Sequence, residues 1–177
     1  MEIGGEEQLG RETLREFQTR LAERLRGAQS TARDDSRLGF IAGGRQWLVS
    51  LDQVNEVVSV PEVAEAPWGK PWFMGVASVR GMLYGCTDLA VYTGLSDSIP
   101  KGDARLLLVH PRFGVNAAFR VDRTVGLRMV REMTRSAPAQ DAAPWIEASW
   151  QAADGSNWVE LDVEKLVTEP AFLEAGV

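Results

Sequence analysis

The chain has 177 residues, and its 19 basic and 25 acidic side chains give a formal net charge of −6 at pH 7. This balance argues against a nucleic-acid-binding protein, because binding to phosphates needs a clustered excess of lysine and arginine. A single cysteine and a single histidine exclude an intramolecular disulfide and a zinc site of about four Cys and His ligands. The longest uncharged run, 71–79, is far shorter than the roughly twenty apolar residues of a spanning helix. We therefore expect a cytoplasmic protein without direct membrane insertion, metal or cofactor.

Before residue 37 the sequence has the pattern of one amphipathic helix over residues 7–28, which Gly27 and the polar run 29–31 are expected to end. A charged connector over 30–37 would follow. Two interpretations stay open: the helix docks on its own domain, or it binds a partner. The apolar stripe consists of Leu14, Phe17, Leu21, Leu25 and Ala28.

After residue 37 the chain changes to short β-type runs, separated by turn signals every eight to twelve residues. The pairs 43–44 and 154–155 are two-residue hairpin signals, and 111–114 joins another hairpin. Asp88 and Asp162 are each expected to cap a short helix. Nine or ten strands predict an all-β sandwich or barrel. The expected strands are 38–42, 46–50, 57–60, 76–79, 82–87, 105–110, 115–121, 125–130, 145–152 and 157–161, with loops at 61–71, 96–103 and 136–144.

The residues that could carry chemistry do not form a catalytic pattern. His110 ends a predicted strand and is expected to be structural or solvent-facing. Cys86 lies inside a predicted strand, where a free thiol behaves as a small hydrophobe. The aspartates 88, 122 and 162 each follow a strand, so capping and turn roles are expected rather than a hydrolytic pair. No catalytic or metal-binding residue is therefore predicted.

Six tryptophans are many for this length. Four lie on predicted strands and are expected in the core or at a barrel seam. Trp68 lies in the proline-containing loop 61–71, and Trp72 follows directly after it. We expect them to cover one end of a barrel, and the alternative is that they anchor an interface.

One segment stands out, because Arg80 is the only charged residue between Lys70 and Asp88. Gly81 follows it directly, so a sharp turn is expected there. A lone arginine between two apolar strands is either buried with a carboxylate or placed to meet a partner. The residue type alone leaves both open.

From residue 38 to about 168 the chain resembles the CheW-type chemotaxis coupling proteins, through six elements in the order and spacing of that family. They are the hairpin 40–51, Val54-Asn-Glu56-Val57, the proline loop, Gly75-Val76 with Arg80-Gly81 and then Asp88-Leu89, the hairpin 105–121 with Val121-Asp122, and a last strand with Leu161-Asp162. The sequence departs from the family where Gly85, Cys86 and Thr87 replace a proline and an apolar pair, and where Ser78 replaces an asparagine. The helical extension and the style of residues 80–89 look most like the PilI-type members, which serve type IV pilus twitching motility.

The resemblance implies a mainly all-β fold: a pair of five-stranded SH3-like β-barrels on a shared hydrophobic interface, with an N-terminal α-helix and short connecting helices. We accordingly divide the chain into a helix and connector (1–36), a CheW-like domain (37–168) and a tail (169–177).

The resemblance also implies a non-catalytic adaptor. Members couple the cytoplasmic tip of a methyl-accepting type chemoreceptor to the regulatory domain of a chemotaxis-type sensor histidine kinase, at membrane receptor arrays. Carried over by position, the receptor-binding groove would contain Val54, Glu56, Arg80 and Gly81. If the N-terminal helix binds a partner rather than its own domain, its contact residues would be Leu14, Phe17, Leu21 and Leu25.

Two other function classes compete with the adaptor. A β-barrel that binds a small apolar ligand needs one wide barrel, whereas two small barrels are filled by their own side chains. A carboxylate-based hydrolase needs clustered carboxylates with perturbed pKa values in a cleft. The sequence favours the adaptor over both.

Overall fold

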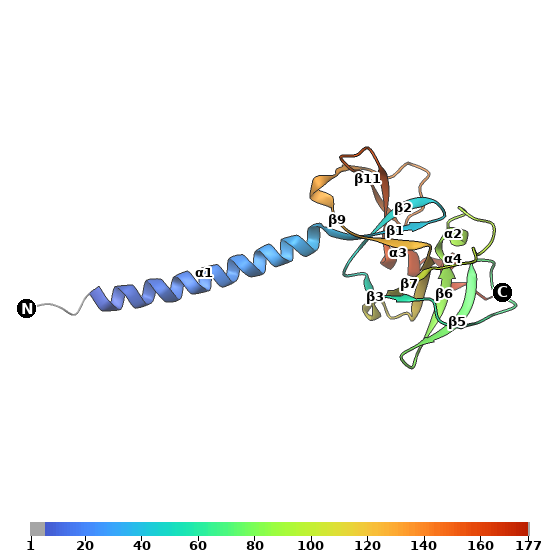
Figure 1. Ribbon diagram of the computed structural model, residues 1–177, viewed down its shortest axis with the longest axis horizontal. Helices are drawn as coiled ribbons and strands as arrows, with labels where there is room; N and C mark the ends of the chain where they lie inside the picture. The colour runs from blue at the N-terminus through green and yellow to red at the C-terminus, as the bar shows by residue number, and fades with distance from the viewer. Residues whose placement is uncertain (1–5, 177) are drawn as a thin grey trace, which may run out of the picture. The chain divides into compact units, whose positions relative to one another are not determined.

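A computed structural model describes residues 6–176, and it describes the side chains of residues 14–29 and 34–176. The chain divides into two units, Met1–Asp35 and Ser36–Val177, which are described separately below. The first unit contains helix α1 (Glu6–Asp35) (Figure 1). No helix of the described chain is long and apolar enough to cross a membrane.

Helix α1 is longer than the sequence predicts. The expected end near residue 28 and the expected connector over 30–37 are wrong, because the helix continues to Asp35 and the first strand begins at Ser36. Gly27 costs only about 1 kcal/mol inside a helix, and no glycine or proline follows it before residue 36.

The second unit consists mainly of two six-stranded sheets. The first has the order β10-β11-β12-β2-β1-β9, and the second has the order β3-β7-β8-β6-β5-β4. The pairs β2–β12 and β6–β8 are parallel and the others are antiparallel. The strands of the first sheet are β1 (Ser36–Ala42), β2 (Arg45–Ser50), β9 (Arg123–Met129), β10 (Thr134–Ser136), β11 (Ile146–Gln151) and β12 (Asn157–Leu161). Those of the second are β3 (Val54–Ser59), β4 (Val63–Ala64), β5 (Phe73–Val79), β6 (Met82–Asp88), β7 (Arg105–Val109) and β8 (Ala117–Val121).

Each sheet closes into a small barrel, because the two strands at its outer ends are neighbours in the chain. Residues 130–133 join β9 to β10, and residues 60–62 join β3 to β4. Links this short bring the outer strands together, so the sheet must curl. The predicted pair of SH3-like barrels is thus confirmed. The sixth strand of each sheet is the short strand β10 or β4, which the sequence analysis missed.

The apolar residues form one shared core between the sheets and a smaller core inside each barrel. Strand β7 shows the alternation: Leu107 and Val109 lie in the shared core, and Leu106 and Leu108 lie inside the second barrel. The first barrel is filled around Leu48, Val130 and Trp158. The shared hydrophobic interface was therefore predicted correctly.

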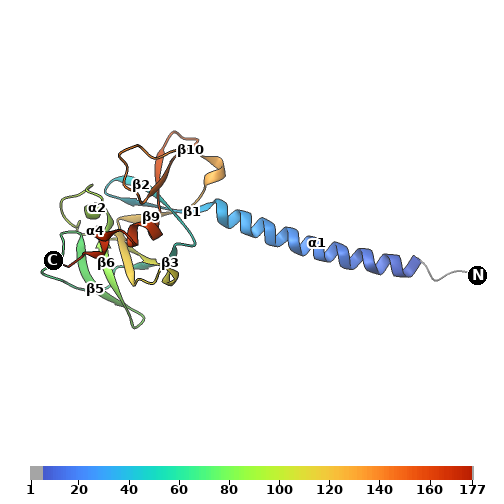
Figure 2. The same cartoon turned by 180° about the vertical axis from the view of Figure 1, so that it is seen from behind.

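Short helices complete the second unit. Asp88 caps α2 (Leu89–Tyr92) and Asp162 caps α3 (Val163–Val167), as predicted. The segment 169–177, expected to be a tail, contains helix α4 (Pro170–Leu173). Helices α2 and α4 lie side by side in Figures 1 and 2, and the rings of Tyr92 and Phe172 are 5.8 Å apart. Single-turn helices η1 (Pro111–Phe113) and η2 (Val130–Glu132) follow β7 and β9.

Trp68 and Trp72, the two tryptophans near the proline-containing loop, differ in burial. Trp72 stacks on Phe172 at 5.8 Å and packs against the core shared by the two sheets, whereas the expectation placed it over one end of a barrel. The same expectation is wrong for Trp68, which is 81% exposed.

Candidate functional site

Glu56 and Arg80 form an exposed ion pair on the second barrel. Both terminal nitrogens of Arg80 donate to the Glu56 carboxylate, each at 2.5 Å, in a bidentate contact. The Arg80 side chain is 73% exposed and that of Glu56 is 30% exposed. The carboxylate accepts these hydrogen bonds and adds its charge, which raises the pKa of Arg80. The pair joins residues 24 positions apart in the sequence, one on β3 and one in the turn after β5, and β3 and β5 are not neighbours in the sheet.

The backbone at Arg80 explains how its side chain is presented. Val79 pairs with Met82, so Arg80 and Gly81 form a two-residue hairpin turn between β5 and β6. Their φ angles are 50° and 79°, the left-handed values that this turn needs. Among the described residues, Arg80 is the only non-glycine with positive φ. A side chain kept in this unfavourable conformation at an exposed turn is a candidate for a functional role.

The four residues expected in the groove do not all lie in one place. Gly81 is exposed beside Arg80, and Glu56 meets Arg80 directly. Val54 pairs with Val109 and packs against the shared core, and the register shifts between Val54 and Glu56. The structure thus brings Glu56, Arg80 and Gly81 together and turns Val54 toward the interior.

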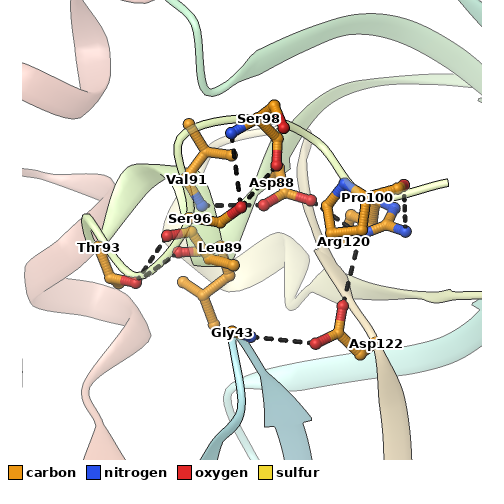
Figure 3. Close-up of polar contacts among 11 residues, drawn as sticks. Gly43, Asp88, Leu89, Val91, Thr93, Ser96, Ser98, Pro100, Arg120 and Asp122 are labelled. Atoms are coloured by element: carbon orange, nitrogen blue, oxygen red, sulfur yellow. Dashed lines mark hydrogen bonds and ion pairs between the residues drawn. The ribbon is translucent and has the colours of Figure 1, made fainter.

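A second polar cluster, buried and missed by the sequence analysis, surrounds Arg120 on β8 (Figure 3). One terminal nitrogen of Arg120 lies 2.9 Å from Asp88 and 3.6 Å from Asp122. The other donates to the carbonyl oxygen of Pro100 at 2.8 Å. The signal was present in the sequence, because a charged residue inside the buried strand Ala117–Val121 needs a buried partner of opposite charge.

The aspartates of this cluster are used for structure. The second carboxylate oxygen of Asp88 accepts the backbone N–H of Val91 at 2.9 Å, which caps α2. Asp122 accepts the backbone N–H of Gly43 at 3.0 Å, and so ties the second sheet to the β1–β2 turn of the first. The predicted capping and turn roles of Asp88 and Asp122 are therefore confirmed.

The two remaining candidate residues have structural surroundings. His110 accepts the backbone N–H of Arg112 through Nδ1 at 3.1 Å, and so caps η1. Cys86 is buried, as predicted, and burial raises the pKa of its thiol to about 11. Within residues whose side chains are described, no three His, Cys, Asp or Glu residues lie together as a metal site would require.

Comparison with known proteins gives three findings. A family model described as CheW-like domain matches residues 37–171. Protein PilI of Pseudomonas aeruginosa is 30% identical over 162 residues, which cover 89% of each chain. The crystal structure of the scaffolding protein TtCheW from Thermoanaerobacter tengcongensis superposes with a TM-score of 0.61 at 16% identity, covering 72% of this chain and 88% of that one.

Proposed function

The chain belongs to the family of CheW-like domain proteins, adaptors of chemosensory signalling, and on this premise we propose that it couples a methyl-accepting type chemoreceptor to a chemotaxis-type histidine kinase. In this role it is not an enzyme. It works in the cytoplasm and is recruited to membrane receptor arrays. Its relative PilI supports a place in a system that controls type IV pilus twitching motility.

The observation that carries the proposal is the exposed Arg80 in its strained turn. Glu56 holds the guanidinium in one orientation, so little side-chain freedom is lost when a partner binds. A guanidinium offers five donors, and two of them remain directed to Glu56 while the others stay free for a partner's carboxylate or carbonyl groups. We place the receptor contact at Glu56, Arg80 and Gly81, with Val54 supporting strand β3 from inside.

Helix α1 is a second proposed interaction element. Leu14, Phe17, Leu21 and Leu25 lie on one face and are 47–61% exposed. A row of four large apolar side chains on a helix is typical of a surface that a partner covers.

Titration of the purified protein with a soluble receptor cytoplasmic fragment tests the coupling role. We expect Arg80→Ala to weaken binding about 10- to 100-fold, as loss of charged hydrogen bonds does. The matched control is Arg112→Ala, which removes another exposed arginine paired with a carboxylate, Asp52, at 2.9 Å.

The control should bind the receptor fragment as the wild type does, and both variants should keep the wild-type melting temperature, because exposed ion pairs contribute little to stability. His110→Ala should also keep coupling in a twitching assay. Unchanged receptor binding by Arg80→Ala would remove Arg80 from the proposed contact.

A further inference from the structure

The exposed stripe of α1 has a symmetric spacing. Leu14, Phe17, Leu21, Leu25 and Ala28 follow one another at steps of three, four, four and three residues, so the order reads the same in both directions from Leu21. All five are exposed, and the helix is regular and unbroken across them (Figure 2). A two-fold symmetric contact needs such a self-complementary surface, because each chain presents the same patch to the other.

The stripe does not fit a parallel coiled coil. A heptad that starts with Leu14 and Phe17 continues with Leu21 and then requires an apolar residue at position 24, which is Arg24. The next large apolar residue is Leu25, one position further round the helix. A parallel pair in this register would also oppose Phe17 with Phe17 and Arg24 with Arg24. The other register, with Leu14, Leu21 and Ala28 at d and Leu25 at a, places Gln18 in the seam and leaves Phe17 outside it.

An antiparallel pair centred on Leu21 fits the side chains better. Leu21 then faces Leu21 of the second copy, Phe17 faces Leu25, and the longer Leu14 faces the short Ala28. On either side of the central Leu21 pair, a larger residue thus meets a smaller one, which suits the interdigitation of closely packed helices. Arg24 comes to lie beside the aromatic ring at position 17 of the other copy, where a cation–π contact is favourable.

We propose that α1 binds α1 of a second copy of this chain in an antiparallel pair centred on Leu21. The inference rests on the proposal that the stripe of α1 is an interaction element, and it identifies a second copy of this chain as the partner. The contact covers residues 14–28, about 22 Å of helix at ~1.5 Å per residue. An interface of this length falls among weak contacts of less than about 1,200 Å², so pairing is expected where adaptors are concentrated.

Disulfide cross-linking of the full-length protein tests this register. The native Cys86 is buried with a raised pKa, so introduced cysteines dominate the reaction. Under mild oxidation, Leu21→Cys should form a covalent dimer at least ten times faster than Thr19→Cys, an exposed position on the opposite face. Leu14→Cys should not cross-link to itself, but should cross-link when mixed with Ala28→Cys.

Other cross-linking patterns overturn the proposal. Equal dimer formation by Leu21→Cys and Thr19→Cys excludes the stripe as a self-association surface. Self-cross-linking of Leu14→Cys at the rate of Leu21→Cys excludes the antiparallel arrangement. Receptor and kinase titrations of Leu21→Glu separate the two proposals: lost coupling without any cross-linking of Leu21→Cys would keep α1 as an interaction element and reject the second copy as its partner.

Discussion

The guanidinium of Arg120 lies 2.9 Å from the carboxylate of Asp88, and both side chains are buried. The pair joins the middle of β8 to the residue that caps α2, and Arg120 also holds the carbonyl oxygen of Pro100 in the loop after α2. A buried charge destabilises the folded state strongly when its partner of opposite charge is removed. This relationship therefore fixes α2 and its loop against the second sheet.

Arg120→Met should lower the free energy of unfolding by about 3–5 kcal/mol, because it leaves the Asp88 carboxylate buried without its partner. Urea denaturation of the full-length protein measures the change. Arg112→Met is the control, since its ion pair with Asp52 is exposed and contributes at most about 1 kcal/mol. A loss below 1 kcal/mol for Arg120→Met would mean that water or another group replaces the guanidinium.

Gly75→Ala should be among the most damaging single-methyl changes in the second barrel. The φ of Gly75 is 127°, and an added Cβ would lie 2.0 Å from the carbonyl oxygen of Ala64 on β4. We expect a loss of at least about 3 kcal/mol, measured by urea denaturation. Gly126→Ala separates the clash from the backbone conformation, because Gly126 also has positive φ but open space around it, and it should cost only about 1–2 kcal/mol.

A shortened protein that begins at Asp34 should fold without α1. The shared core and both barrel cores consist of residues from Leu38 onward, and β1 begins at Ser36. Circular dichroism should show a β-type spectrum and one cooperative melting transition. An insoluble or molten product would show that the stripe of α1 belongs to the core of the body.

Cys86 should make stability fall at alkaline pH. Burial raises the pKa of its thiol from 9.0 to about 11 in the folded protein. Between these values the unfolded chain ionises and the folded one does not, so the free energy of unfolding decreases as pH rises, by at most about 2–3 kcal/mol. Below about pH 9 the thiol is neutral in both states and the effect vanishes.

Urea denaturation of wild type and Cys86→Ala at about pH 8 and pH 10.5 checks this dependence. Lysines and tyrosines titrate in both proteins, so the difference between them isolates the thiol. Parallel losses in the two proteins would assign the pH dependence to other groups.

Local signals in the sequence predicted much of the fold. The glycine pair 43–44 has positive φ at both residues and joins β1 to β2, and Asp88 and Asp162 cap the helices expected from them. These features depend on a few neighbouring residues, whose turn and capping chemistry can be read directly. The end of α1 was wrong because a single Gly27 weakens a helix without ending it.

The contacts that were missed depend on residues far apart in the chain. Phe172 falls in the segment expected to be a tail, because a lone aromatic residue after Pro170 has no periodicity that would predict its stacking on Trp72. An arginine fits buried and exposed sites equally. Its residue type therefore could not predict the strained backbone of Arg80 or its ion pair with Glu56. The placement of Val54 depends on the register shift in β3, which no local pattern marks.

The order of strands has a consequence for synthesis on the ribosome. All strands of the second sheet lie between residues 54 and 121, whereas the first sheet combines β1 and β2 with strands from the other end of the body. Trp47 pairs with Val159 in the parallel pair β2–β12, so this pairing can form only after residue 159 has been synthesised. A growing chain emerges at about 5–20 residues per second, so the second barrel can close while the hairpin β1–β2 still has an uncovered apolar face. The barrel whose first strands emerge first is therefore completed last, and until then the nascent chain exposes the apolar face of the β1–β2 hairpin.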